Sequence, residues 1–198
     1  MRDFTSFFAG SSLDGSGWAR CTEPITWSVD VSALPRDQRR PEVLRLTSAM
    51  LAWATASGLP ITYRGRERLE YDRATHQLVP VDGGPLARRH IYVSFLREGV
   101  SPLLKGDVVG LAMPSRVVVP THEVVGGNVV LRAAFVRGGD TDYPLLLRGL
   151  DLHEIGHAMA LGHAHYVTNA MYPTIRTRAR LGLGDTRGAK AFLKPCGA

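Results

Sequence analysis

The chain has 198 residues, which is enough for one domain with a hydrophobic core. Its hydrophobic share of 44% and charged share of 21% are typical of globular proteins, and no stretch approaches the roughly 20 apolar residues of a membrane helix. The net charge of +6 comes from scattered arginines, since Lys105, Lys190 and Lys194 are the only lysines among 24 basic residues; recognisable nucleic-acid-binding motifs are absent, so we expect no nucleic-acid partner.

The beginning of the chain predicts an arm, a strand, a long helix and a second strand. Residues 1–20 are rich in Gly and Ser and predict a flexible N-terminal arm. Residues 25–31 alternate apolar and polar side chains, as a half-buried strand does. Apolar residues at helical spacing predict a helix that begins at Pro41 and ends at 58–60, and residues 61–63 predict the next strand.

The middle of the chain predicts short strands. Residues 64–89 are polar and contain a Gly-Gly-Pro turn signal, so they predict a surface hairpin. Pro114 cannot donate to a strand ladder, which predicts that the segment around it is an edge strand or a bend. The other expected elements are a strand over 91–95, this edge strand over 108–119, a turn at 126–128 and a strand from 129 onward.

The last third predicts two helices. Thr141 or Asp142 can cap a helix whose first residues are Tyr143-Pro144 and which runs to Met159. A final short helix is expected from about 185 to 193. Strands and helices in this order predict an α+β fold with the helices on one side of a sheet.

The two cysteines, Cys21 and Cys196, lie near opposite ends of the chain. Cysteines so far apart are not a local zinc pair, and a disulfide that ties the ends together is the preferred interpretation. A disulfide indicates a secreted or extracytoplasmic protein, although the first residues contain no signal-peptide apolar run. The alternative is two unrelated buried thiols in a reducing compartment.

The most informative segment is His153-Glu154-Ile155-Gly156-His157, with His163 further on. Two His four residues apart share one face of a helix, so both imidazoles can reach one ion. Glu154 is displaced around the helix, where it can contact a water at the metal without being a ligand. Zinc with three protein ligands keeps a position open for that water, and a nearby carboxylate can take its proton.

The residues after His157 limit the candidates for the third metal ligand. Many zinc peptidases of this helix type use a downstream Glu, but the chain has no Glu after Glu154. His163 and His165 therefore remain as candidates. His163 is favoured because it matches the extended zinc-peptidase pattern and follows Gly162, where the helix could stop and the chain turn back.

With these residues the sequence resembles the metzincin zinc endopeptidases, and within them the matrixin-like branch. The family motif is His-Glu-x-x-His-x-x-Gly-x-x-His, and residues 169–173, Asn-Ala-Met-Tyr-Pro, look like its Met-turn. The resemblance implies a metzincin-like zincin fold: a twisted mixed sheet, a long helix, an active-site helix, and a small C-terminal part with the Met-turn and a final helix. It implies one catalytic domain over 21–198, with a larger part over 21–163 and a smaller part over 164–198.

The resemblance also implies an activity, that of a zinc-dependent endopeptidase. Its single catalytic zinc ion would be held by His153, His157 and His163. Glu154 would be the general base, and Met171 would be the Met-turn residue beneath the zinc.

The same resemblance implies where substrate binds. An extended protein or peptide would pair with the edge strand near Leu111 and Ala112, and the segment from Pro173 to Ile175 would wall the pocket beyond the cleaved bond. We expect a monomer. Asp140 and Asp142 are candidate calcium ligands, with helix capping as the alternative role.

The sequence departs from the family motif at one position. Ala160 occupies the family's Gly position; if that position needs a positive φ, Ala costs about 1 kcal/mol or more, unless Gly162 carries the turn.

Two alternative functions remain. The first is a zinc-binding protein without turnover, against which the intact Glu154 argues. The second is a basic surface- or nucleic-acid-binding module with structural zinc, for which His165 would be a fourth ligand, since structural sites usually have four.

Overall fold

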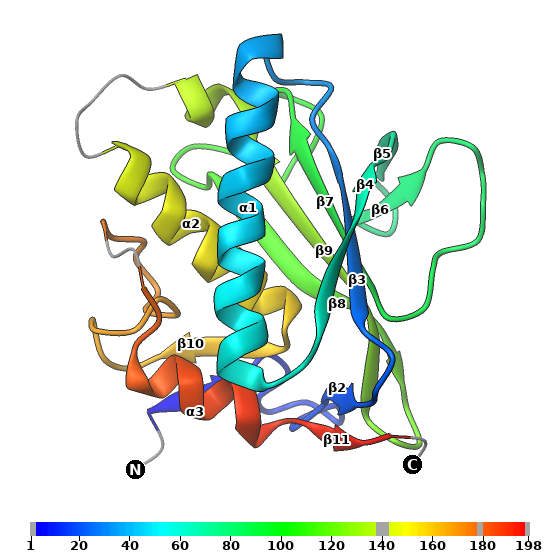
Figure 1. Ribbon diagram of the computed structural model, residues 1–198, viewed down its shortest axis with the longest axis vertical. Helices are drawn as coiled ribbons and strands as arrows, with labels where there is room; N and C mark the ends of the chain where they lie inside the picture. The colour runs from blue at the N-terminus through cyan, green and yellow to red at the C-terminus, as the bar shows by residue number, and fades with distance from the viewer. Residues whose placement is uncertain (1–2, 138–142, 178–179, 197–198) are drawn as a thin grey trace.

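The computed structural model describes residues 3–137, 143–177 and 180–196. Within these residues lie three α-helices, a short 3-10 helix and eleven strands (Figure 1). The helices are α1 (Arg36–Ser57), α2 (Tyr143–Ala158), α3 (Leu183–Ala191) and η1 (Ala133–Arg137). The strands are β1 (Phe4–Ser6), β2 (Gly17–Arg20), β3 (Ile25–Asp30), β4 (Ile61–Arg66), β5 (Leu69–Asp72), β6 (Gln77–Pro80), β7 (His90–Leu96), β8 (Gly110–Val118), β9 (Glu123–Arg132), β10 (Leu161–Ala164) and β11 (Lys194–Pro195).

A mixed, mostly parallel sheet forms the centre of the described chain. Its strand order is β11-β2-β9-β7-β3-β4, and each of these neighbours is parallel to the next. β8 runs antiparallel to β9 and lies beside it at the edge. The helices cover one face, while the β5–β6 hairpin lies on the other (Figure 1). This arrangement is compatible with the α+β class expected from the sequence, and the hairpin falls within the predicted segment 64–89.

The main hydrophobic core lies between the helices and the sheet, and it fixes the position of α2. The indole nitrogen of Trp18 on β2 donates to the carbonyl of Ala158, and that of Trp53 on α1 donates to the carbonyl of Leu152, each at 2.9 Å. Both indoles are almost completely buried. Since a buried indole N–H needs a partner, these two bonds hold α2 at its centre and at its C-terminal end.

An ion pair also joins α1 to α2. The Nε atom of Arg45 donates to Oδ2 of Asp151 at 2.7 Å, and one terminal nitrogen donates to Oδ1 at 3.2 Å. Glu42, three residues before Arg45, contacts the same guanidinium group. Asp151 is fully buried and precedes His153 by two residues, so this pair joins α1 to the part of α2 that leads into His153.

Two expectations about element boundaries were wrong. The predicted turn at 126–128 lies inside β9, because the glycines serve close packing: a Cβ on Gly127 would lie 3.3 Å from both the Cβ of Ala158 and a side-chain carbon of Ile91. The long helix begins at Arg36, so Pro41 lies inside it; Pro41 removes one helical hydrogen bond, which the packing of α1 tolerates.

The N-terminal residues are also placed differently from the loose arm that their composition predicted. β1 pairs antiparallel with β10, and β2 pairs parallel with β9 and with β11. Gly17 permits part of this packing, since a Cβ there would overlap the backbone of Phe192. Main-chain pairing therefore outweighs the flexibility that Gly and Ser favour.

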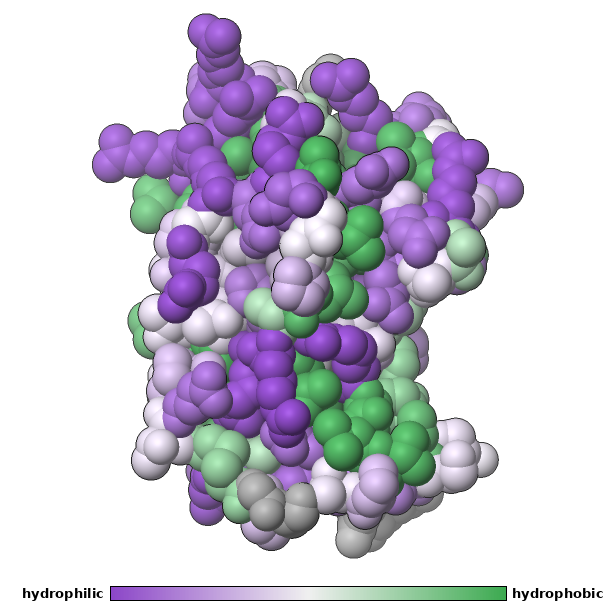
Figure 2. All heavy atoms as spheres, turned by 90° about the vertical axis from the view of Figure 1, so that its right-hand side faces the viewer, coloured by the Kyte–Doolittle hydropathy of each residue, from purple (hydrophilic) through white to green (hydrophobic). Residues whose placement is uncertain are grey.

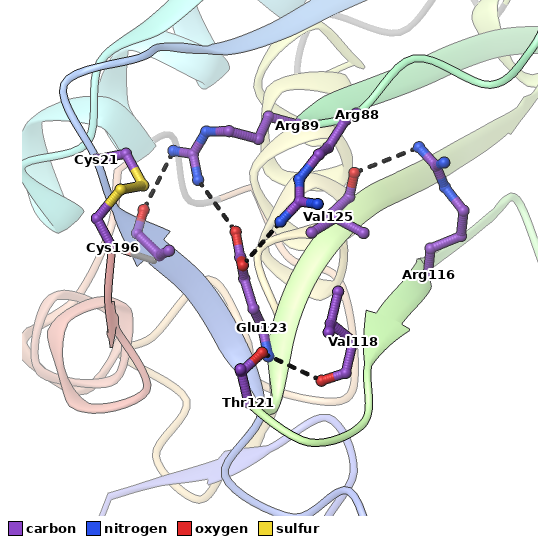
Figure 3. Close-up of polar contacts among 10 residues, drawn as sticks. Cys21, Arg88, Arg89, Arg116, Val118, Thr121, Glu123, Val125 and Cys196 are labelled. Atoms are coloured by element: carbon purple, nitrogen blue, oxygen red, sulfur yellow. Dashed lines mark hydrogen bonds and ion pairs between the residues drawn. A yellow bond between two sulfur atoms is a disulfide. The ribbon is translucent and has the colours of Figure 1, made fainter. Parts of the chain in front are cut away.

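The predicted disulfide between Cys21 and Cys196 is present, with Cα atoms 5.0 Å apart (Figure 3). It follows β2 at one end and β11 at the other, and these two strands pair. Beside it, buried Arg89 donates to the carbonyl of Ala19 at 3.1 Å and reaches the carboxylate of Glu123 at 3.7 Å. The disulfide thus closes the β11–β2 edge of the sheet.

Removal of this disulfide will lower the free energy of unfolding by about 2–4 kcal/mol, because the bridge closes a loop of 175 residues in the unfolded chain. The measurement is urea unfolding of the parent and of a Cys21→Ser, Cys196→Ser double variant. An unchanged midpoint at an unchanged slope would show that the bridge does not constrain the unfolded chain.

The face of the molecule that carries the β5–β6 hairpin is mostly hydrophilic (Figure 2). Figure 2 shows the face on the side of the β5–β6 hairpin, where hydrophilic side chains cover most of the surface and hydrophobic ones gather in smaller patches. In the described part of the chain, no helix has the length and hydrophobicity required to span a bilayer.

Candidate metal centre

Three imidazole groups meet at the C-terminal end of α2. His153 and His157 project from the same face of the helix, and His163 reaches them from β10. One ring nitrogen from each lies within 4.8 Å of the other two, and these three form the group that could hold a metal ion among the described residues. His165, the alternative third ligand, is not in that group.

Hydrogen bonds fix the tautomers of the two helical histidines. Nδ1 of His153 lies 2.8 Å from the carbonyl oxygen of Ala170, and Nδ1 of His157 lies 2.8 Å from that of Leu161. A carbonyl only accepts, so each Nδ1 carries the hydrogen and each neutral ring keeps a lone pair on Nε2. The two Nε2 atoms face each other at 3.1 Å.

Burial keeps both rings neutral. It lowers the pKa of His153 to about 4 and that of His157 to about 3, and the neighbouring imidazoles add to the effect. At neutral pH two lone pairs therefore point at one another with no proton between them. A cation bound by both nitrogens would remove the repulsion between these two lone pairs.

Zinc fits this donor set. It binds imidazole nitrogens at about 2.0–2.1 Å in tetrahedral sites, which places two such nitrogens roughly 3.3 Å apart. The 3.1 Å separation of the Nε2 atoms is close to that value. The Nδ1 bonds to backbone carbonyls are the outer contacts that orient metal-binding histidines, and three protein ligands leave one position open.

Glu154 lines the same cleft as the three histidines and is only 4% exposed. Burial, reinforced by the negative charge of Asp151, raises its pKa to about 8. A carboxyl group in this environment is ionised at neutral pH only where a positive charge stands close by. Glu154 therefore needs a neighbouring cation to act as a base, just as the facing imidazoles need one to relieve their lone-pair contact.

The start of β8 approaches the carboxyl group of Glu154 closely. A Cβ added to Gly110 would lie 2.6 Å from Oε1 of Glu154 and 2.7 Å from its Cδ and Cγ atoms. Gly110 has no positive φ, so glycine serves this close approach rather than a turn. The contact of Gly110 with Glu154 was not predicted from the sequence; a glycine within a strand pattern is the signal for such an approach.

The cleft has a volume of about 450 Å³ and lies between β8 and the segment after β10. Leu111 and Ala112 line it from the edge strand, and Pro173 and Ile175 line it from the opposite side. The structure thus brings all four predicted substrate-binding residues to one cleft with the histidines. β8 pairs with β9 on one side, and among the described residues no strand pairs with its other side, so that side can accept an added strand.

The helix carrying the first two histidines ends at an unusual residue. α2 stops at Ala158, and Ala160 adopts a φ of 72°. The position where the family has Gly therefore does use a left-handed conformation, and Ala occupies it. Gly162 has no positive φ, so the expectation that it carries the turn was wrong.

Met171 lies beneath α2, almost completely buried. A Cβ on Gly156 would overlap the sulfur of Met171, so the glycine admits this side chain under the helix. The turn that contains Met171, over residues 169–173, is held in place by Asp185 of α3. The Asp185 carboxylate accepts hydrogen bonds from the backbone nitrogens of Ala170 at 2.6 Å and of Met171 at 3.1 Å. The sequence predicted no role for Asp185 in this turn, because its partners lie 15 and 14 residues away.

The proposed calcium ligands Asp140 and Asp142 lie outside the described residues.

Phe7, near the N-terminus, lines the cleft beside His157, although nothing in the sequence connected it to the candidate metal site.

Comparisons with known proteins give limited support for a family. No model of a protein family matches the chain. Over 166 residues, or 82% of this chain, the sequence is 27% identical to matrix metalloproteinase-25 of Mus musculus. The chain spans about a quarter of that protein's length, 23%. The likeness indicates a relationship to a metalloproteinase.

Proposed function

We propose that this protein is a zinc-dependent endopeptidase of the matrixin-like type. The observation that carries the proposal is the pair of unprotonated Nε2 atoms of His153 and His157, which face each other at 3.1 Å within reach of His163 and in the cleft of Glu154. The likeness to matrix metalloproteinase-25 supports the same interpretation.

The residues of the cleft have separate roles in this proposal. When bound, zinc supplies a Lewis acid that polarises a carbonyl group and lowers the pKa of water. Glu154 accepts the proton of the attacking water and passes it to the leaving amine. β8 aligns the substrate backbone as an added strand near Leu111 and Ala112. Met171 packs beneath the histidines and keeps α2 at a fixed distance from the turn.

The proposal includes the organisation of the chain. The proposed catalytic domain spans 21–198, and β1 and β2 of the preceding residues pair with its strands. Its larger part over 21–163 supplies most of the sheet and α2, and its smaller part over 164–198 supplies the turn, α3 and β11. The protein acts as a monomer on proteins or peptides. The disulfide supports a secreted or extracytoplasmic location.

The structural-zinc alternative is less favoured by the donor set. Structural zinc sites are usually closed by four protein ligands. Among the described residues, the group whose ligand atoms lie close together contains three histidines and does not include His165. The cleft is bordered by an edge of β8 to which no strand of the described chain pairs, and such a cleft suits a substrate better than a closed structural site does.

Digestion of an unbiased peptide library, with and without a chelator, tests this function. We expect cleavage that stops with the chelator and returns with zinc. Apolar side chains should be preferred immediately after the cleaved bond, because Pro173 and Ile175 are apolar and an unpaired charge buried there would be costly. A library left intact by zinc-loaded protein would rule out the endopeptidase.

Gly110→Ala is expected to lower the rate of peptide hydrolysis by about 10²-fold, the typical effect of misplacing a reacting group by 1 Å. The new Cβ would displace both the carboxyl group and the Cγ atom of the buried Glu154 side chain, so the melting temperature of the variant is measured beside its rate. Gly84→Ala is the matched control, since its Cβ would meet only the side chain of Asp82, at 3.3 Å. Equal rates in both variants would show that Gly110 does not position Glu154.

A further inference from the structure

The N-terminal segment, residues 3–8, lies along the strand that carries His163. β1 pairs with β10, with Phe4 opposite Ala164 and Ser6 opposite Leu161, and the two form a separate two-stranded sheet within the described chain. The hydroxyl group of Thr5 donates to the carbonyl oxygen of His163 at 2.8 Å. β1 is thus the strand partner of β10 and holds the backbone of the third candidate ligand directly.

The same segment continues to the other side of the metal centre. The backbone nitrogen of Phe7 donates to the carbonyl of Ala160 at 3.0 Å. The Phe7 ring then packs edge to face on the ring of His157, with centroids 5.7 Å apart, and lines the cleft with His157 and His163. An apolar ring at this place limits the access of solvent to the ligands, and such shells tune metal sites.

Gly162 explains how the segment comes so close. A Cβ there would overlap the hydroxyl oxygen of Thr5 and lie 2.6 Å from the carbonyl oxygen of Ser6. Gly162 does not have a positive φ, so its conformation does not require glycine. The absence of a side chain next to His163 serves the docking of the N-terminal segment.

Contacts on the side of the segment away from β10 hold it against α3 and against the turn over residues 169–173. The side-chain amide of Asn169 donates to the carboxylate of Asp3 at 3.2 Å. The ring of Phe4 packs edge to face on Phe192, with centroids 5.8 Å apart, and a Cβ on Gly188 would lie 3.2 Å from Phe4. Residues 3–8 are therefore fitted between β10 and α3 by side chains on both sides.

We propose that docking of the N-terminal segment sets the metal affinity of the site, with Thr5 and Phe7 as positioning residues for His163 and His157. This inference rests on the proposed zinc site. Loss of the Thr5 bond frees the backbone at His163, and displacement of the segment removes the cover of His157. Disruption of such outer contacts typically lowers metal affinity by about 10–100-fold.

The test measures zinc affinity by competition with a chelator, at a temperature where every variant is folded. We expect Gly162→Ala and Thr5→Val to bind zinc about 10–100-fold more weakly than the parent. Thr5→Ser retains the hydroxyl group and should retain the parent's affinity. The controls are Gly84→Ala and Thr55→Val; the Thr55 hydroxyl makes a similar bond, 2.9 Å to the carbonyl of Leu51, on the exposed side of α1.

The spectrum of the cobalt-substituted protein provides a second readout, because it reports the geometry of the ligands and a purely structural role would leave it unchanged. We expect it to change in Thr5→Val but not in Thr55→Val. If Gly162→Ala does not fold, Thr5→Val decides. Zinc affinity and cobalt spectra equal to those of the parent would overturn the inference while leaving the proposed function intact, whereas a parent that binds no zinc would overturn the proposed function itself.

Discussion

Replacement of Glu154 by Gln will lower peptide hydrolysis by a factor of at least about 10²–10⁴, the usual contribution of a positioned acid–base group, and will leave zinc bound. The amide keeps the shape of the side chain but cannot accept a proton. Glu154 lines the cleft and does not belong to the group of metal-binding atoms, so the metal site should be unaffected. The measurement is the rate of peptide cleavage together with zinc content and melting temperature.

Glu154→Ala serves as a second variant, because it also removes the volume of the side chain. Both variants should lose activity to a similar extent if proton transfer is the role of Glu154. A variant that retains its zinc and cleaves as fast as the parent would contradict that role. A rate that falls only in step with zinc content would instead assign Glu154 to metal binding.

Replacement of Asp151 by Ala is expected to lower the free energy of unfolding by about 3 kcal/mol, the low end of the usual cost of breaking a buried ion pair, because the Arg45 guanidinium group then keeps only Glu42 as a partner. The Arg45 side chain is 13% exposed and that of Asp151 is 0% exposed, so water reaches little of the guanidinium group and none of the carboxylate. The pair also ties α1 to the part of α2 that precedes His153. Urea unfolding of the parent and the variant measures the effect.

The matched control is Glu98→Ala, which breaks an ion pair with Arg132 at the surface, where the Glu98 side chain is 75% exposed. Surface pairs typically contribute up to about 1 kcal/mol. Equal losses in Asp151→Ala and Glu98→Ala would show that burial does not strengthen the dependence on Asp151.

Features encoded by local spacing could be predicted from the sequence. Alternation over 25–31 predicted β3, because side chains on a strand alternate between its faces, and the strand expected over 91–95 lies within β7. The spacing of His153 and His157 predicted that they share a helix face, since residues four apart are neighbours on a helix. The positive φ at Ala160 was foreseen as a conditional requirement, from the resemblance rather than from the residues.

Features that depend on contacts between distant segments could not be predicted in this way. Gly126 and Gly127 have the composition of a turn, but β9 pairs with β7 and β8 at both positions, and Gly127 also packs against Ala158 of α2. Residues 3–8 have the composition of a loose arm, but their partner β10 lies more than 150 residues along the chain, and no local pattern records that pairing. Gly110 and Gly162 are likewise required by neighbours far away in sequence.

The zinc content of the parent, His163→Ala and His165→Ala tests the central claim most directly. His163 is the proposed ligand that separates the extended motif from a short helical pair, and its ring nitrogen lies within 4.8 Å of those of His153 and His157. Elemental analysis after dialysis should find one zinc per chain in the parent and in His165→Ala, and a large loss in His163→Ala. Zinc that persists in His163→Ala and is lost from His165→Ala would contradict the assigned metal centre.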